Sequence, residues 1–418
     1  MIDSPKENFG GWRVCISLAV IVSLGMALVN TFGVVYLSVA ADFNLDLAVV
    51  GLGMSIFMMM VGLTAPILGK FADKGPIKPI MLGGVVLMVL GVGIMTRTEN
   101  GYFLAIGMLV ASLGIVMHGM VPSNGIITNW FIERRATALA ILAVGLAFGG
   151  LWLPPAAAWL MENGSVENDW RYALQVLSYI LAGITVVFIY FGVIRTPEEI
   201  GQNPDGALNG STESQIVSTE KDDESFRLAL RSRDLWFTAI AFGMLTMVSL
   251  ANGTYIVPFL EQNAGVSKIE ASLAISVISF ASIIGSLSAG IIADKIGSKS
   301  VLIISQSIIV LAFLVYLSHP GYIISIIAAA FVGLGIGAFL PMQPNSAGSR
   351  FGRGIAGRVI GIYGLMGLPF SLSVIPLAGM LSSRVGSFDI IFQVGILILL
   401  LAIVMISLTA FEPESDDA

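Results

Sequence analysis

Four asparagines and one histidine stand out in this chain, because they are polar residues placed inside long apolar stretches. Asn30 and Asn252 lie 222 positions apart, and Asn124 and Asn345 lie 221 positions apart. His118 shares a stretch with Asn124. An amide both donates and accepts hydrogen bonds, and a histidine side chain titrates near neutral pH. One hypothesis is that the asparagines bind a polar solute, and that His118 carries a coupled proton or, when charged, attracts a carboxylate. The alternative for each residue is a structural hydrogen bond to a neighbouring helix.

Three further polar side chains are weaker candidates for solute binding, since each could instead satisfy a partner at a helix interface: Tyr255, Gln343 and Tyr363. The sequence contains no Gly-x-x-x-x-Gly-Lys-Ser/Thr phosphate loop, so we do not expect ATP to drive the protein. It also contains no metal-ligand cluster, and its single cysteine, Cys15, excludes a disulfide within the chain. We therefore predict neither an enzyme nor a bound metal or cofactor.

The composition shows which elements must position these residues. Hydrophobic residues make up 56% of the chain and charged residues 11%, against about 25% charged in soluble proteins. A hydrocarbon core of ~30 Å needs about 20 apolar residues per helix, and backbone groups in lipid must be satisfied within each segment. We therefore expect an all-α polytopic membrane protein. Its twelve predicted helices are 13–38, 48–70, 78–97, 102–128, 136–160, 171–194, 234–260, 270–293, 299–318, 321–347, 354–381 and 387–411.

Basic residues predict the orientation of these helices. With twelve crossings, seventeen of the 21 lysines and arginines fall on one side of the membrane. Loops rich in lysine and arginine remain in the cytoplasm. We expect both termini and the central loop to be cytoplasmic, in a multi-pass protein of the cell membrane.

A short motif that occurs twice predicts two related halves. Gly69-Lys70-Phe71-Ala72-Asp73-Lys74 recurs as Gly290-Ile291-Ile292-Ala293-Asp294-Lys295, and each copy closes a long apolar stretch. Such long-period repetition is typical of transporter folds built from repeats. We predict an N-terminal six-helix bundle (1–194), a cytoplasmic linker (195–233) and a C-terminal six-helix bundle (234–418). The linker is polar and acidic, so we expect it to be a flexible tether.

The paired motifs and the six-plus-six arrangement resemble the major facilitator superfamily. This resemblance implies two pseudo-symmetric bundles around a central cavity that opens alternately to either side. It also implies a cytoplasmic latch at the repeated motif, with nearby basic residues as partners. A purely topological role for those basic residues is equally open. The latch residues are Asp73, Lys74, Asp294 and Lys295, with Arg134, Arg135, Arg353 and Arg358 as partners.

Finer motifs resemble the monocarboxylate and oxalate/formate transporters within that superfamily. The segment from Asn129 to Arg135 looks like that group's entry to the fifth helix, and Gly11-Trp12-Arg13 is similar to the start of its bacterial members. Thr254 to Leu260 in the seventh helix is similar as well. The resemblance implies a small organic acid as substrate. Carboxylate transporters of the group typically hold a cation in the eighth or eleventh helix, and no charge occurs between Ala271 and Ala293.

These observations predict a secondary active or facilitative transporter of a small, monocarboxylate-like anion. One alternative is an exporter of a neutral or amphipathic compound, and another is a membrane sensor that binds without transporting. The expected partners are the solute, a co-transported proton or a counter-exchanged anion, and the lipid bilayer. We expect a monomer that binds no nucleic acid.

Overall fold

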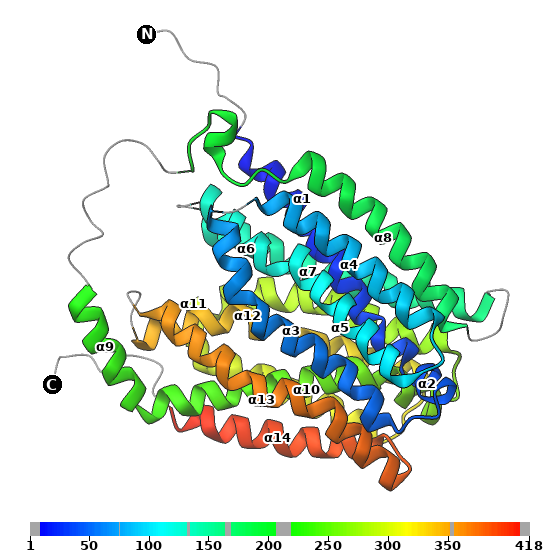
Figure 1. Cartoon of the computed structure of the whole chain (residues 1–418). Coiled ribbons are helices and arrows are strands. Elements are labelled where there is room, and N and C mark those ends of the chain that lie inside the picture. The colour runs from blue at the N-terminus through cyan, green and yellow to red at the C-terminus, as the bar shows by residue number, and fades with distance from the viewer. Residues whose placement is uncertain are drawn as a thin grey trace. The chain divides into compact units, whose positions relative to one another are not determined.

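The computed structural model of the chain describes residues 9–74, 76–131, 134–163, 169–205, 219–351 and 355–409. These residues are almost entirely helical (Figure 1). Within the described ranges the only β-type pairing is an isolated bridge between Phe131 and Asp205. The helices are α1 (Gly11–Asn30), α2 (Phe32–Asp42), α3 (Leu47–Lys74), α4 (Ile77–Arg97), α5 (Gly101–His118), α6 (Met120–Trp130), α7 (Arg135–Asn163), α8 (Trp170–Gly192), η1 (Pro197–Ile200), α9 (Thr219–Arg231), α10 (Arg233–Ala264), α11 (Lys268–Leu317), α12 (Tyr322–Phe351), α13 (Ala356–Val385) and α14 (Asp389–Ser407).

The helices match the stretches that composition predicts. In the described part of the chain, eleven helical segments are long and apolar enough to cross a membrane. The predicted stretch 48–70 falls in α3, which has 28 residues. The 50-residue α11 contains two of the eleven segments, Lys268–Ala293 and Lys295–Leu317. Near the start of the second segment, Gly297 leaves the helical conformation with φ 80° and ψ 152°. The all-α, polytopic fold is therefore confirmed.

Two predicted helices are divided. The first consists of α1 and α2, which meet at Thr31. The fourth consists of α5 and α6, which meet at Gly119, where the backbone takes φ −87° and ψ −131°. Pro122 follows within the first turn of α6, where a missing N–H breaks no helical hydrogen bond. The backbone break therefore lies directly after His118.

The linker is more ordered than its composition indicates, so the prediction of a flexible tether throughout is wrong for its second part. Residues Thr219–Arg231 form α9, which precedes the start of α10 by one residue. Phe226, Ala229 and Leu230 recur at helical spacing, and Ala229 is buried. Residue composition hides this apolar face, because the surrounding positions are mostly charged.

The chain divides into two compact units, and each is described by itself. Unit 1 comprises Met1–Thr31, Met59–Leu153 and Asn163–Gly210, whereas unit 2 comprises Phe32–Met58, Pro154–Glu162 and Ser211–Ala418. Unit 2 therefore includes two short segments that come from the N-terminal half of the sequence. The predicted domain boundaries at 194 and 234 remain a prediction, since these units report packing rather than the sequence repeat.

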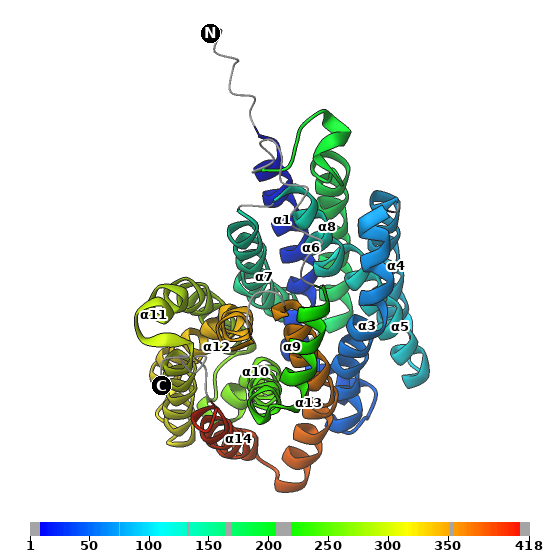
Figure 2. The ribbon, with the colours of Figure 1, turned by 90° about the vertical axis from the view of Figure 1, so that its left-hand side faces the viewer.

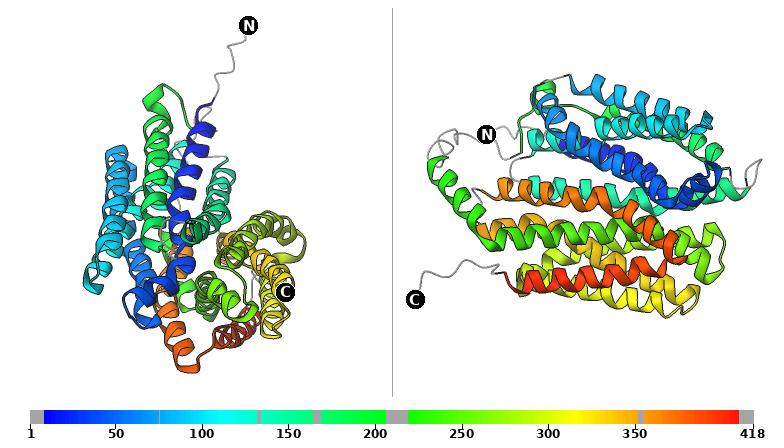
Figure 3. Two further views of the ribbon diagram at one scale, coloured as in Figure 1. Left: turned by 90° about the vertical axis from the view of Figure 1, so that its right-hand side faces the viewer. Right: turned by 60° about the horizontal axis from the view of Figure 1, so that its bottom comes forward.

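Close helix packing builds both units. In unit 1, α4 packs on α5 and α8, and Gly145 and Gly149 let α7 approach α1. A side chain at Gly145 would lie 2.4 Å from the carbonyl oxygen of Ala19. In unit 2, α13 and α14 both pack on α10 (Figure 2), and α14 runs alongside α10 for much of its length (Figure 3, right).

Candidate functional site

His118 lies at the interface between α5 and α1 in unit 1. Its side chain is fully buried, and Nδ1 lies 2.7 Å from the carbonyl oxygen of Gly114, one turn earlier. Nε2 has no hydrogen-bond partner among the described residues. A Cβ atom at Gly25 of α1 would lie 3.2 Å from Nε2. One imidazole nitrogen therefore lies close to α1 without a hydrogen-bond partner in the described structure.

The two asparagines of unit 1 lie on different helical segments. Asn30 ends α1, and Asn124 lies in α6, shortly after the break at Gly119. Both side chains are half-buried, and no hydrogen bond joins either amide to another described residue. Their amides can therefore hydrogen-bond a ligand or water without breaking a contact within the described part of unit 1.

Three predicted residues on α12 and α13 of unit 2 fall into two environments. Gln343 and Asn345 are half-buried on α12. Tyr363 of α13 is buried, with its ring centre 5.0 Å from that of Phe242 and its hydroxyl beside Ser346. Tyr363 is therefore an interior contact between α10, α12 and α13, whereas the α12 amides are partly accessible.

Asn252 of α10 differs from the other asparagines because it is buried and unsatisfied. Its side chain is 1% exposed, and neither amide atom has a hydrogen-bond partner in the described structure. It lines a cavity of about 240 Å³ within unit 2. The predicted ring of four asparagines has members in both units, so the ring itself remains a prediction.

Tyr255 lies at the centre of a hydrogen-bonded contact between α10, α13 and the segment Phe32–Met58. Its hydroxyl donates to the carbonyl oxygen of Ile375 (2.7 Å) and lies 2.8 Å from the hydroxyl of Tyr36. The Tyr36 hydroxyl donates to the carbonyl oxygen of Leu47 (2.5 Å). The sequence did not single out Tyr36; its position six residues after Asn30, in the same apolar stretch, was the available signal.

A second hydrogen bond joins the same segments. The Ser55 hydroxyl of α3 donates to the carbonyl oxygen of Leu372 in α13. Four residues beyond Leu372, position 376 is a proline within the helix, and it has no N–H to offer that carbonyl. Ser55 supplies the missing donor. We call the hydrogen-bonded set Tyr36, Tyr255, Ile375, Ser55 and Leu372 the outer contact, since it lies toward the helix ends predicted to face away from the cytoplasm.

The outer contact is closely packed. Gly33 lies so close to α10 that a Cβ atom there would come within 2.8 Å of the carbonyl oxygen of Gly253. Only a glycine permits this backbone approach. The contact therefore combines tight packing with a small number of hydrogen bonds.

A half-buried lysine lies near the outer contact. Lys268, the first residue of α11, donates from Nζ to the hydroxyl of Ser38 (3.0 Å). The carboxylates of Glu162 and Glu261 lie within Coulombic reach of it, and Glu162 also accepts a hydrogen bond from the backbone N–H of Ile269 (2.9 Å). This cation precedes the uncharged stretch Ala271–Ala293 by three residues.

The predicted latch is described only in part. The side chains of Asp73, Lys74, Arg135, Asp294 and Arg353 lie outside the described residues. Of the remaining members, Arg134 and Lys295 are exposed. The Arg134 backbone N–H donates to Asp205 (2.9 Å), and the Arg358 guanidinium lies 5.4 Å from the ring centre of Phe226 in α9.

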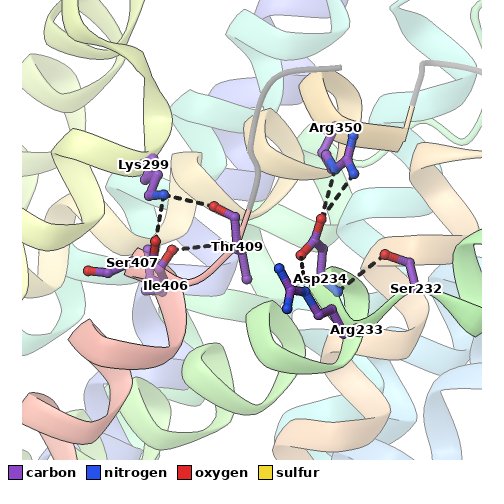
Figure 4. Close-up of polar contacts among 8 residues, drawn as sticks. All are labelled: Ser232, Arg233, Asp234, Lys299, Arg350, Ile406, Ser407 and Thr409. Atoms are coloured by element: carbon purple, nitrogen blue, oxygen red, sulfur yellow. Dashed lines mark hydrogen bonds and ion pairs between the residues drawn. The ribbon is translucent and has the colours of Figure 1, made fainter. Parts of the chain in front are cut away.

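Two other charged contacts stabilise the predicted cytoplasmic end of unit 2 (Figure 4). The Arg350 guanidinium donates twice to one carboxylate oxygen of Asp234, at 3.0 and 3.2 Å, and Asp234 is only 6% exposed. Lys299 donates to the carbonyl oxygens of Ser407 and Thr409, both at 2.8 Å, at the end of α14. Lys299 follows the second copy of the repeated motif, so this motif is tied to α14.

The aromatic residues Trp130 and Phe131, in the segment Asn129–Arg135 that resembles the monocarboxylate group, have a structural role in unit 1. The indole N–H of Trp130 donates to the carbonyl oxygen of Ile194 (2.8 Å), and Phe131 packs against Trp12 with ring centres 4.8 Å apart. The backbone N–H of Asp205 donates to the carbonyl oxygen of Trp130 (3.1 Å). This hydrogen bond attaches the start of the linker to the segment Asn129–Arg135.

No three His, Cys, Asp or Glu side chains of the described residues lie together as a metal site requires. The chain instead combines apolar helices long enough to span a membrane, partly accessible amides, and the outer contact with its few hydrogen bonds. These features define a multi-pass membrane protein of the transporter class.

Comparison with known proteins identifies the family. The family model of the Major Facilitator Superfamily matches residues 15–256 and 246–418. The chain belongs to this superfamily, and it is accordingly a transporter of small-molecule solutes and not an enzyme. A solved bacterial homologue of the human lysosomal transporter Spinster, in an inward-facing conformation, has the same fold. It superposes with a TM-score of 0.73 over 96% of this chain and 97% of its own, at 16% identity.

Three relatives from different organisms are also transporters by name. The MFS-type transporter YcxA of Bacillus subtilis is 24% identical over 348 residues, which is 80% of this chain and 79% of that protein. Monocarboxylate transporter 13 of Bos taurus is 22% identical over 88% of this chain and 83% of its own. The fujikurins efflux protein of Gibberella fujikuroi is 25% identical over 66% of this chain and 55% of its own. The resemblance to the monocarboxylate group is thus confirmed.

Proposed function

We propose that this protein transports a small organic anion of the monocarboxylate type across the cell membrane by alternating access, with both termini in the cytoplasm. The outer contact is the observation that carries the proposal. It joins Phe32–Met58 to α10 and α13 through the hydroxyls of Tyr36, Tyr255 and Ser55. Since one hydrogen bond contributes only ~0.5–1.5 kcal/mol, substrate binding can supply enough free energy to open such a contact.

Substrate recognition is assigned to the accessible amides. Asn30, Asn124, Gln343 and Asn345 are half-buried, and amide N–H groups can donate to a carboxylate. The similarity to monocarboxylate transporter 13 supports an organic acid. Lys268 provides the cation at the predicted outer end, where it attracts anions once Ser38 and the nearby carboxylates move away.

Proton coupling is assigned to His118, because its Nε2 is buried and unpartnered. The test uses proteoliposomes with and without an imposed pH gradient, carrying wild type, His118→Gln or His319→Gln. His319 is the matched control, since it is the chain's other histidine and is exposed. We expect gradient-driven uptake to be lost only in His118→Gln, whereas equal loss or equal retention in both variants would contradict the assignment.

Counterflow tests the substrate class. Purified protein in liposomes loaded with unlabelled lactate, pyruvate or acetate should accumulate the labelled acid transiently, and protein-free liposomes should not. Propanol of similar size is the uncharged control. Absence of counterflow with every acid would refute the anion assignment.

The second candidate is export of an uncharged amphipathic compound. It is favoured by the absence of charge between Ala271 and Ala293 and by the similarity to the fujikurins efflux protein. Efflux of an uncharged amphiphile from preloaded vesicles, with no counterflow of acids, would select this function.

A further inference from the structure

We propose that unit 2 contains a second binding site, separate from the half-buried amides assigned to the solute, which takes a compact, uncharged amphipathic molecule. The ligand has an apolar body about the size of a substituted benzene ring and one group that hydrogen-bonds Asn252. This inference is independent of the proposed carboxylate substrate, because it depends only on a cavity and on the unpaired amide in it.

The cavity lies among four helical elements of unit 2. Asn252 and its neighbours on α10 form one wall, Phe313 of α11 contributes a ring, and α13 and α14 form the other sides. Both helices pack on α10 (Figure 2). Leu377 of α13 lines the cavity and is 43% exposed, so the cavity is open toward the surface of the unit beside that residue.

The volume and the lining residues of the cavity determine the size and polarity of the ligand's main part. The volume is about 240 Å³, more than the ~150 Å³ of an apolar cavity that takes benzene. Every lining residue except Asn252 is apolar, including Met247, Val248, Phe392 and Ile398. No ionised side chain lines it, so a carboxylate or an ammonium group would be desolvated with no opposite charge to compensate it.

Asn252 determines which polar group the ligand must carry. Its amide offers two donors and an acceptor, it is 1% exposed, and both atoms lack a partner in the described structure. A lipid acyl chain would fill the volume but would leave the amide unpaired. A small molecule with an amide or hydroxyl group on an apolar body fills the volume and pairs the amide.

The site adjoins the outer contact. On α10, Asn252 lies one helical turn before Tyr255. On α13, the lining residues Val374 and Ala378 lie within one turn of Ile375. The Ile375 carbonyl accepts the hydrogen bond from Tyr255. A ligand in the cavity therefore contacts α10 and α13, the two helices that this hydrogen bond joins.

The test measures binding of 4-fluorobenzamide and 4-fluorotoluene to the full chain in lipid nanodiscs by ligand-observed ¹⁹F NMR. The variants are Asn252→Leu, which removes the amide, and Ala378→Leu, which fills the cavity. Gln306→Leu is the matched control, because Gln306 is another buried and unpaired amide of unit 2 that does not line the cavity.

We expect wild type to bind 4-fluorobenzamide and Asn252→Leu to bind it about tenfold more weakly. Ala378→Leu should bind neither ligand. The control Gln306→Leu should bind both ligands as wild type does. Equal affinity for the two ligands, unchanged by Asn252→Leu, would overturn the proposal and indicate an apolar crevice for lipid chains. Absence of 4-fluorobenzamide binding to wild type would overturn it as well, and thermal unfolding of each variant identifies any that fails to fold.

Discussion

Removal of the Ser55 hydroxyl should open the outer contact more than removal of the Tyr255 hydroxyl, although both changes delete one hydrogen bond. The difference comes from the carbonyl groups left behind. The carbonyl of Ile375 keeps its helical donor four residues on, at Gly379, whereas the carbonyl of Leu372 faces Pro376 and depends on Ser55.

The magnitudes follow from this difference. An unsatisfied buried polar group costs ~1–3 kcal/mol, whereas loss of one typical hydrogen bond costs ~0.5–1.5 kcal/mol. Ser55→Ala should therefore raise the ratio of open to closed outer contacts about 5- to 150-fold. Tyr255→Phe should raise it by no more than about tenfold, since Tyr36 and Tyr255 have only two hydroxyl protons for three oxygen–oxygen contacts.

The assay is electron–electron double resonance between spin labels at Ala41 and Val385, which are exposed residues of unit 2, in a Cys15→Ala background. Ser373→Ala is the matched control, because the Ser373 hydroxyl bonds only within its own helix, to Pro369 and Phe370. Equal populations in Ser55→Ala and Ser373→Ala would refute the reasoning about the Leu372 carbonyl.

Three further predictions concern charge and burial in unit 2. Arg350→Leu should destabilise the protein by up to about 3 kcal/mol, because the buried Asp234 carboxylate loses both hydrogen bonds from Arg350 and keeps only the exposed Arg233, 3.9 Å away. Thermal unfolding should show most of this loss recovered in the Asp234→Leu/Arg350→Leu double variant, and no recovery would contradict the pairing. Lys299→Met should weaken the end of α14 by ~0.3–1 kcal/mol, measured as faster hydrogen exchange before Thr409 and not elsewhere. Asn252→Leu without ligand should stabilise the protein by ~1–3 kcal/mol, because two unpaired buried atoms are replaced by an apolar group, and a lower unfolding temperature would be inconsistent with an unpaired amide.

The sequence predicts the helices well because lipid imposes a simple rule on length and polarity. The eleven apolar segments and α3 follow the stretches between charged clusters. The rule does not locate breaks inside an apolar stretch. The break at Gly119 depends on a single backbone conformation, and it lies inside one continuous apolar stretch. Helix α9 escaped prediction because its apolar face is short and lies among charged residues.

The candidate site was predicted only in part, since polarity identifies a residue without identifying its partner. Tyr255 was selected as a polar residue at membrane depth, but the contacts of its hydroxyl with Tyr36 and with the Ile375 carbonyl depend on how distant segments pack. Ser55 resembles many serines of the chain, and its role follows from Pro376, more than 300 residues away. Asn252 was selected for its symmetry with Asn30, whereas its distinctive feature is an unpaired amide in an apolar cavity.

Opening and closing of the outer contact as solute is carried is tested by the spin-label pair at Ala41 and Val385 in proteoliposomes, in the Cys15→Ala background with Ser55 and Tyr255 unchanged. We predict two distance populations, whose ratio changes when an acid that shows counterflow is added and does not change with propanol. A single distance that is identical with and without a transported acid would contradict the account.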